Sequence, residues 1–159
     1  MIISNATPLI AFARIQRLDL LRQVVGSLVI PEMVAEEIRG YRGGQYAEID
    51  LKRESWITVQ SVKSQTQVRL LLPTLDQGEA EVITLALEQK AKLVLIDELT
   101  GRKVAESLHL SVMGSVGILI RAKQMGIIPT VRPLLDEMVN RGIRYSQRFI
   151  TSVLQQIGE

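Results

Sequence analysis

Hydrophobic positions along the chain occur in two patterns, short apolar runs and longer stretches with helical spacing. The short runs predict strands at residues 1–4, 28–30, 56–62, 93–96 and 111–113, the third of them an edge strand. Most of these runs are followed by a segment with the apolar periodicity of a helix. Strands that alternate with helices predict a parallel sheet. We therefore expect an α/β fold with a short central parallel sheet flanked by helices on both faces.

Helix-start and helix-stop residues set the expected limits of the helices. Thr7 as cap, with Pro8 in the first turn, predicts one helical stretch that continues to Gly26. The D-x-x-E pattern that begins at Asp76 is typical of a capping box, and its helix should run to about residue 90. Ser115 is the expected cap of a helix that ends at residue 126. The remaining helices are expected at 31–40, 100–108, 133–141 and 146–157.

Two short segments do not fit this alternation. The sequence GYRGGQY at residues 40–46 is rich in glycine and is predicted to be a flexible loop. Three consecutive leucines at residues 70–72 form an apolar run, which indicates either a dimer face or a buried helix.

Length and composition restrict the class of protein. A chain of 159 residues predicts a single domain over 1–159, and the hydrophobic share of 47% is enough for a core. The absence of cysteine excludes disulfides, cysteine-ligated zinc and thiol catalysis. The first residues lack the features of a signal peptide, and no apolar run approaches the roughly 20 residues of a membrane span. We expect a cytoplasmic protein without membrane contact.

Charge is informative mainly in its distribution. The net charge of +2 is too small to indicate a nucleic-acid partner by itself. Basic residues nevertheless outnumber acidic ones after residue 120, which is typical of a surface that faces a polyanion or simply of a solvated surface. The basic residues are Arg121, Lys123, Arg132, Arg141, Arg144 and Arg148, against Asp136, Glu137 and Glu159.

Polar residues follow three of the predicted strands. Asn5 comes after the first strand, Asp97 and Glu98 follow the strand at 93–96, and Ser115 comes shortly after the strand at 111–113. Ligands of open parallel sheets bind outside the carboxyl ends of the strands. The sequence therefore predicts an oxygen-rich site at this edge of the sheet.

Helical spacing adds two carboxylates to this set. Glu37 lies on the same face as the apolar stripe of its helix, whereas its neighbour Glu36 lies on the solvated side. Glu79 is in line with the apolar face of the next long helix, whereas Glu81 is nearly opposite. An inward carboxylate is costly unless something compensates its charge. We therefore expect Glu37 and Glu79 to point into the site and Glu81 to point outward.

Converging carboxylates at Glu37, Glu79 and Asp97 would repel one another unless a cation lies between them. With oxygen donors, no cysteine and one histidine, Mg²⁺ or Mn²⁺ is the natural partner. Such ions activate water and bind phosphate oxygens in phosphodiester hydrolysis. Structural roles remain open at this point: Glu79 as a member of the capping box, Glu37 as a partner of an arginine such as Arg14, and Asp97 as the cap of the next helix.

Four short motifs, together with their order and spacing, resemble the PIN domain. They are SNATPLI at 4–10, VAEEI at 34–38, GEAE at 78–81 and LID at 95–97, and MGSVG at 113–117 fits as well. The resemblance implies the PIN-domain fold and, with it, the activity of a metal-dependent ribonuclease. It places the four metal-binding and catalytic positions at Asn5, Glu37, Glu79 and Asp97. Supporting positions are Thr7, Ser115 and Glu98, with Glu81 a weaker candidate.

The resemblance extends to PIN-like toxins of toxin–antitoxin pairs, the VapC-like ribonucleases. It implies RNA as substrate, a cognate antitoxin protein as partner and a homodimer. Asn5 is the departure from the pattern, because an amide supplies an oxygen ligand but no negative charge, and metal binding should weaken. A module that binds RNA or a protein without cleaving is therefore the alternative.

Other enzyme classes lack support in the sequence. Neither a dinucleotide-binding G-x-G-x-x-G motif nor a P-loop is present, and there is no nucleophile elbow. His109 lies between two leucines near a helix end and is expected to be structural.

Overall fold

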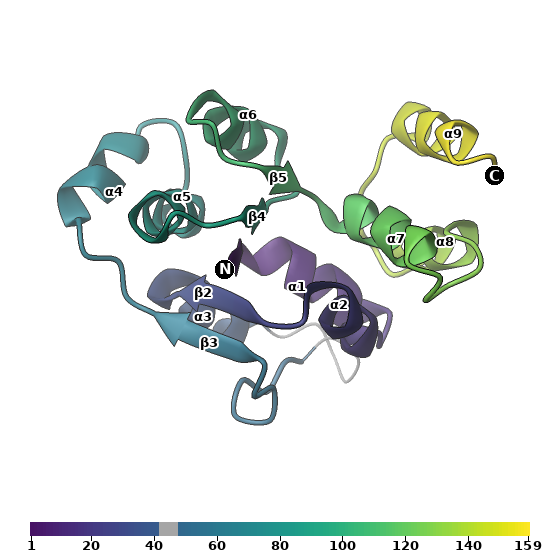
Figure 1. Ribbon diagram of the computed structural model, residues 1–159, viewed down its shortest axis with the longest axis horizontal. Helices are drawn as coiled ribbons and strands as arrows, with labels where there is room; N and C mark the ends of the chain where they lie inside the picture. Colours follow the sequence, from purple (N-terminus) through teal and green to yellow (C-terminus); the bar gives the residue numbers. More distant parts are fainter. Residues whose placement is uncertain (42–47) are drawn as a thin grey trace.

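Five parallel strands form one sheet in the computed structural model, which describes residues 1–41 and 48–159 (Figure 1). They are β1 (Ile2–Ser4), β2 (Leu28–Pro31), β3 (Ile57–Gln60), β4 (Leu93–Leu95) and β5 (Val112–Met113). Their order is β3-β2-β1-β4-β5, and every neighbouring pair is parallel. The α/β prediction is confirmed, and the strand expected at an edge lies at one.

The connections reverse between β1 and β4: after β1 the chain adds β2 and β3 on one side of it, and then β4 and β5 on the other. Ser4 lies opposite Leu95 in the register, and the backbone N–H of Asn5 donates to the Leu95 carbonyl at 2.9 Å. Leu95 in turn lies opposite Met113 of β5. The residues that follow these three strands therefore lie at one edge of the sheet, at the reversal point where open α/β sheets bind their ligands.

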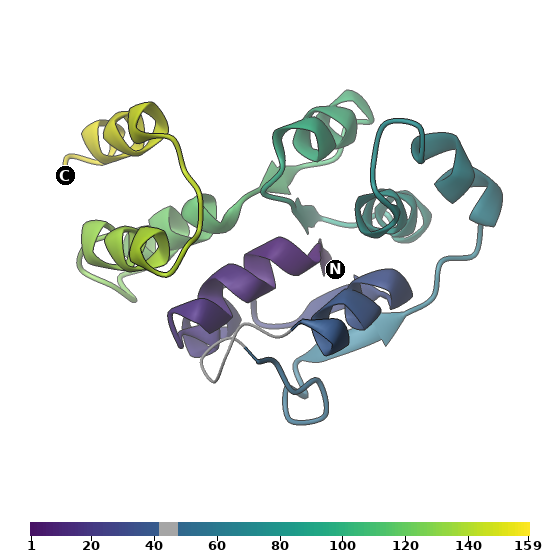
Figure 2. The same ribbon diagram turned by 180° about the vertical axis from the view of Figure 1, so that it is seen from behind.

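Helices connect and cover the strands within the described residues. α3 lies behind β2 and β3 in Figure 1 and in front of them in Figure 2, and α4 lies at the opposite end of the molecule from α8 and α9. The helices are α1 (Ala6–Arg14), α2 (Leu18–Val25), α3 (Glu32–Gly40), α4 (Gln65–Leu71), α5 (Gln77–Gln89), α6 (Leu99–Ser107), α7 (Ser115–Gln124), α8 (Arg132–Asn140) and α9 (Gln147–Gln156). None of them is long and apolar enough to cross a membrane.

The core consists almost entirely of aliphatic side chains, as the composition requires. Phe12 and Trp56 are the aromatic residues buried within it in the described part of the chain. α5 is its central helix, because each of its residues from Gly78 to Ala86 is buried. A helix buried on all sides holds its polar residues firmly in place, since each of them needs a partner inside the protein.

Three details of the helix predictions are wrong. The single helix expected to run from Thr7 to Gly26 is two, α1 and α2, because Gln16 adopts a left-handed conformation with φ of 56° between them. α1 begins at Ala6 with Asn5 at its N-cap position, so Thr7 is a helical residue and not the cap. Gly114, not Ser115, is the N-cap residue of α7.

Other local predictions have mixed outcomes. The capping box is confirmed: Asp76 Oδ1 accepts from the Glu79 N–H at 2.8 Å, and Glu79 Oε1 accepts from the Asp76 N–H at 3.3 Å. The leucine run belongs largely to α4, but Leu70 is 70% exposed, so burial does not account for it. The glycine-rich segment at 40–46 falls mostly on residues 42–47, which lie outside the described residues.

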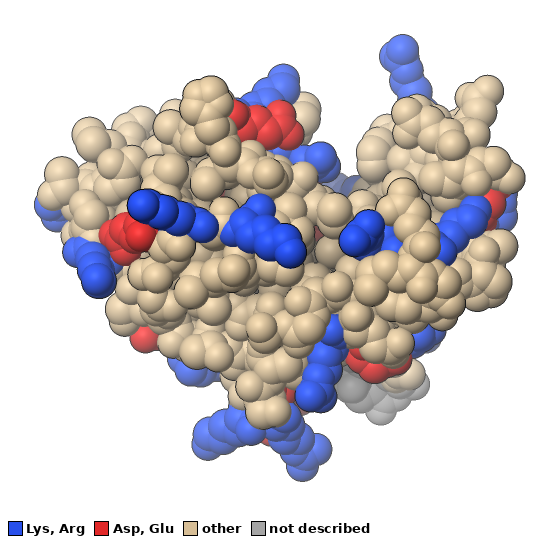
Figure 3. Space-filling model, in the orientation of Figure 1, with Lys and Arg blue, Asp and Glu red and all other residues tan. Residues whose placement is uncertain are grey.

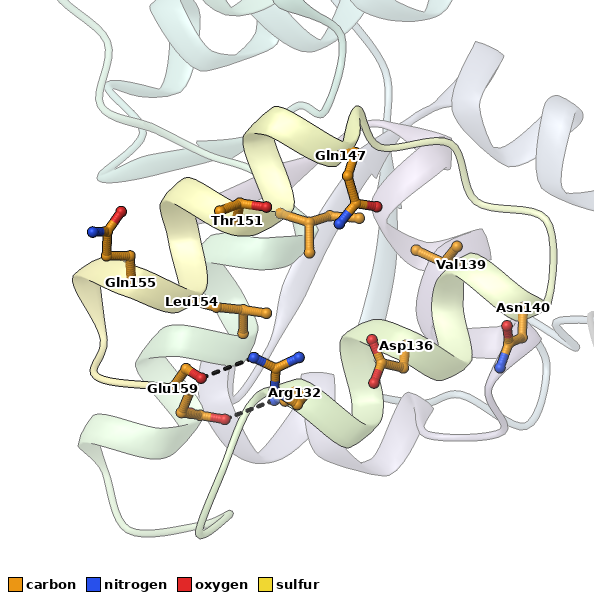
Figure 4. A pocket seen from close by; sticks show the side chains of 10 residues that line it. Arg132, Asp136, Val139, Asn140, Gln147, Thr151, Leu154, Gln155 and Glu159 are labelled. Atoms are coloured by element: carbon orange, nitrogen blue, oxygen red, sulfur yellow. Dashed lines mark hydrogen bonds between the residues drawn. The ribbon is translucent and has the colours of Figure 1, made fainter.

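Glu159, which follows α9, links this helix to the start of α8 by hydrogen bonds (Figure 4). Its carboxylate accepts from the N–H groups of Val131 and Arg132 at the start of α8, and from Lys123 Nζ at 2.8 Å. Burial alone would raise the pKa of Glu159, but these hydrogen bonds and the Lys123 charge lower it to about 2. The side chain is therefore ionised at neutral pH and stabilises the packing of the last helices.

Candidate functional site

Asn5 and Glu37 meet at the first turn of α5. Asn5 is 4% exposed, and its Oδ1 has no hydrogen-bond partner among the described residues. A methyl group added to Gly78 would collide with Glu37 Oε1 and lie 3.3 Å from Asn5 Oδ1. Both oxygens therefore lie against the same glycine, which allows α5 to begin close to the end of β1.

Asp97 lies beyond the end of β4 and is held by the start of α7. Its Oδ1 accepts from the Ser115 N–H at 2.7 Å and from Ser115 Oγ at 2.9 Å. Its Oδ2 is buried and lacks a partner in the described part of the chain. Burial raises the pKa of Asp97, although the Ser115 hydrogen bonds and the charge of Arg102 act in the opposite direction. The hypothesis that Asp97 caps α6 is wrong, because Glu98 occupies that N-cap position.

Glu79 has one oxygen inside the capping box and one outside it. Oε1 accepts from the Asp76 N–H, whereas Oε2 is buried, lies against Gly101 and has no partner among residues 1–41 and 48–159. The structural and the site interpretations of Glu79 are therefore compatible. Burial, followed by the charge of Asp76, raises its pKa to about 7.

The raised pKa of Glu79 has a consequence for the stability of the metal-free protein. The folded protein binds this proton more tightly than the unfolded chain, whose glutamates titrate near 4.5. Stability should therefore fall as the pH rises from about 4.5 through about 7. A cation that neutralised the carboxylate would remove this loss.

Glu81 corrects the helical-wheel prediction. It was expected to point outward but is only 6% exposed, because α5 is buried around its whole circumference. Its Oε1 accepts from the Met33 N–H at 3.1 Å, and its Oε2 accepts from Gln77 Nε2 at 3.2 Å. Its carboxylate therefore lies at the N-terminus of α3, where negative charge is favourable.

Glu37 lies near other carboxylates and has no basic partner in the described structure. Burial raises its pKa, and the charges of Asp76 and Glu81 raise it further. The proposed pairing with Arg14 is wrong, because Arg14 Nε donates to the Tyr41 hydroxyl at 2.7 Å and Nη1 donates to the Arg141 carbonyl at 3.2 Å. Glu37 is thus half-buried and uncompensated.

Two clefts flank Asp97. One, of about 630 Å³, is also lined by Thr7, Glu98 and Arg14. The other, of about 650 Å³, is lined by residues of α6, β5, α7 and α9, among them Arg102. Arg144 and Tyr145 line both clefts. Asp97 therefore lies in the wall between the two clefts.

Sequence reasoning overlooked three contributors to this site. Asp76 was assigned only a capping role, yet its charge acts on both Glu37 and Glu79. The D-x-x-E pattern was a usable signal for it. Arg102 lies in α6, directly after Asp97, and Tyr145 comes from a segment distant in sequence; no local pattern marks either of them.

The basic C-terminal residues do not form one free patch. Lys123 pairs with Glu159, Arg132 bonds the backbone and side chain of Glu159, and Arg141 lies 4.0 Å from Glu137. Figure 3 shows lysine and arginine side chains spread across the whole of one face. A concentrated polyanion-binding surface over the last helices therefore has little support in this arrangement.

The oxygen donors fit a hard divalent cation in their chemistry. Asn5 Oδ1, Glu79 Oε2 and Asp97 Oδ2 are buried, hydrophilic and unpartnered within the described residues, a combination that proteins rarely tolerate without a ligand. No group of three or more acidic or histidine residues in this part of the chain is close enough to form a ready-made ligand set. The carboxylates would therefore have to close around an ion.

Gly101→Ala tests whether the Glu79 carboxylate is held in this position. The new methyl group would collide with Glu79 Oε2 and lie 3.1 Å from Ile96 Cγ2. We expect a loss of about 1–3 kcal/mol in stability, measured by urea unfolding. Gly40→Ala is the matched control, because no atom of the described residues lies within 4 Å of its added methyl group. Equal stabilities for the two variants would contradict the described packing.

A sequence model described as a PIN domain matches residues 1–159 of this chain. No curated protein matches it.

Proposed function

We propose a function from the premise that this chain belongs to the PIN-domain family, a family of nucleases that typically bind RNA and generally use divalent metal ions. The proposed function is a metal-dependent endoribonuclease. One observation carries it: of the four buried side-chain oxygens without a partner in the described residues, three, Asn5 Oδ1, Glu79 Oε2 and Asp97 Oδ2, belong to elements that meet near the ends of β1 and β4.

In this proposal Asn5, Glu37, Glu79 and Asp97 would hold Mg²⁺ or Mn²⁺. When bound, the ion would lower the pKa of a water molecule and neutralise charge on the phosphate. The chain itself orients the donors. Ser115 binds Asp97 Oδ1 and leaves Oδ2 for the cation. In the same way, the Asp76 N–H binds Glu79 Oε1 and leaves Oε2 for the cation.

Thr7 and Glu98 support the proposed site from the cleft beside Asp97. The charge of Glu98 also raises the pKa of Glu79. Glu81 acts at a distance, because its oxygens accept from the Met33 N–H in α3 and from Gln77 Nε2 in α5, while its charge raises the pKa of Glu37. We therefore place Glu81 outside the ligand set.

Asn5 supports the alternative of a module that binds RNA or a protein without cleaving it. It supplies one neutral oxygen where the family pattern has a carboxylate, so the ligand set carries three negative charges. Weak binding of the ion is the expected result. We favour the enzyme, because Asn5 Oδ1 is buried without a partner in the described structure, as expected of an oxygen that binds a cation.

Purified protein is expected to cleave single-stranded RNA in millimolar Mn²⁺ or Mg²⁺ and to stop when EDTA is added. The measurement is the length of end-labelled RNA fragments over time. A Glu79→Gln preparation made in parallel controls for contaminating nuclease and should be inactive. Equal cleavage with and without EDTA, or no cleavage together with no Mn²⁺ binding in calorimetry, would overturn the proposal in favour of the binding module.

Further traits in this proposal come from the resemblance to PIN-like toxins. They are a toxin role, inhibition by a cognate antitoxin, a homodimer and a cytoplasmic RNA target, all carried by one domain over residues 1–159. The exposed Leu70 and Leu72, at 70% and 41%, support a second copy packed against α4. A small gene that overlaps the start of this one would support the toxin role, and its absence would count against it.

A further inference from the structure

A chain of hydroxyl groups joins the segment between α8 and α9 to Asp97. The Tyr145 hydroxyl lies 2.6 Å from Ser115 Oγ, and Ser115 Oγ donates to Asp97 Oδ1 at 2.9 Å. Serine has a single hydroxyl proton, which is used on Asp97. Tyr145 must therefore be the donor to Ser115, and the bonds run in one direction toward the carboxylate.

Tyr145 is held in place from both neighbouring helices. Its ring centroid lies 5.9 Å from that of Phe149 in α9, and its hydroxyl lies 3.7 Å from the sulfur of Met138 in α8. Burial raises its pKa to about 12, so the hydroxyl keeps the proton that it donates. The hydroxyl is thus fixed before any ligand arrives.

We propose that Tyr145 is a positioning residue for Asp97, which acts by fixing the Ser115 hydroxyl so that Oδ1 stays occupied and Oδ2 stays directed at the proposed cation. The role of the cation rests on the proposed function. The orientation itself does not, because it is a property of the metal-free protein. Hydrogen bonds in series to a carboxylate strengthen one another in a partly buried setting, so loss of the first weakens the second.

The Ser115 amide gives a readout that needs no metal. It lies in the first turn of α7, where N–H groups have no acceptor inside the helix, and it donates to Asp97 Oδ1 at 2.7 Å. Its protection from hydrogen exchange therefore reports on the orientation of Asp97. The Ile118 amide donates to the Gly114 carbonyl at 3.1 Å and serves as the internal reference for the same helix.

Tyr145→Phe keeps the ring and removes the hydroxyl. We expect faster exchange at the Ser115 amide, measured by NMR, with Ile118 unchanged. Tyr41→Phe is the matched control, because it also removes a hydrogen-bonded hydroxyl from the cleft but one that contacts Arg14 instead of Ser115. Unchanged Ser115 exchange in Tyr145→Phe, or an equal change at Ile118, would overturn the positioning role whether or not the protein binds a metal.

Mn²⁺ affinity, measured by calorimetry, then tests the consequence for the cation. Tyr145→Phe should bind about threefold to tenfold more weakly than the wild type, as expected for a residue that acts through a ligand's partner. In a Ser115→Ala background the same change should have no further effect. An equal loss in both backgrounds would contradict action through Ser115. A wild-type protein that binds no Mn²⁺, but shows the exchange effect, would overturn the proposed function and leave the positioning role standing.

Discussion

Asp97→Asn is expected to reduce the rate of RNA cleavage in Mn²⁺ by at least about 100-fold. The substitution removes one negative charge and replaces one carboxylate oxygen with an NH₂ group, which cannot bind a cation. The free energy of unfolding in EDTA should not fall, because burial already disfavours the ionised form of Asp97. Cleavage kinetics and urea unfolding on the same preparation separate loss of activity from loss of fold.

Asp136→Asn is the matched control for this change. Asp136 lines the cleft between α8 and α9 shown in Figure 4, away from the ends of the strands. The substitution changes the net charge of the protein by the same amount, so any general effect on RNA attraction would appear in both variants. Cleavage by Asp97→Asn at the wild-type rate would show that the assigned site is wrong.

Asn5→Asp is expected to tighten Mn²⁺ binding about tenfold and to raise the cleavage rate. The new carboxylate would replace an oxygen that is buried, unpartnered among the described residues and directed toward the same glycine as Glu37. Without a cation, in EDTA, the same substitution should be unfavourable. A second carboxylate beside Glu37 would be repelled and desolvated, so the metal-free fold should lose stability.

Asn5→Asp should thus be favourable when Mn²⁺ is bound and unfavourable in EDTA. This contrast distinguishes a metal ligand from a residue that only changes the overall charge. Asn140→Asp, at the end of α8 in the cleft between α8 and α9, adds the same charge; it should leave the Mn²⁺ affinity unchanged and alter the free energy of unfolding equally with and without Mn²⁺. Calorimetry and urea unfolding, each with and without Mn²⁺, provide the comparison. Unchanged Mn²⁺ affinity in Asn5→Asp would mean that Asn5 lies beyond the reach of the ion.

The elements of the fold were predictable wherever the local signal was strong. Apolar runs located all five strands of the described sheet, and the Asp76 capping box located the start of α5. The break between α1 and α2 was not predictable, because Gln16 is an unusual residue for a left-handed conformation and no glycine or proline marks the position.

The helical wheel predicts the orientation of Glu37 correctly and that of Glu81 wrongly. It correctly separated the half-buried Glu37 from the exposed Glu36 in a helix with one solvated face. It failed for Glu81, because the wheel assumes that one face of α5 meets solvent, and none does over Gly78–Ala86. An acidic residue opposite the apolar stripe is then buried as well and must find partners inside the protein.

Tertiary contacts between distant segments were beyond the reach of the sequence pattern. Tyr145 lies 30 residues from Ser115 along the chain, and Ser115 lies 18 residues from Asp97, yet the three side chains form a continuous hydrogen-bonded series. The pairing of β4 with β5 brings Ser115 to Asp97, and the segment between α8 and α9 brings Tyr145 to Ser115. The packing of α5 against α3, which brings the charge of Asp76 near Glu37, is likewise a contact between segments distant in sequence.

A single diffraction experiment tests the central claim that Asn5, Glu37, Glu79 and Asp97 surround one divalent cation. Crystals grown with Mn²⁺ are measured at a wavelength where manganese scatters anomalously. The predicted result is an anomalous peak bounded by Asn5 Oδ1, Glu79 Oε2 and Asp97 Oδ2. A fully occupied Mn²⁺ peak elsewhere, with those three oxygens still lacking an ion at saturating Mn²⁺, would contradict the assignment.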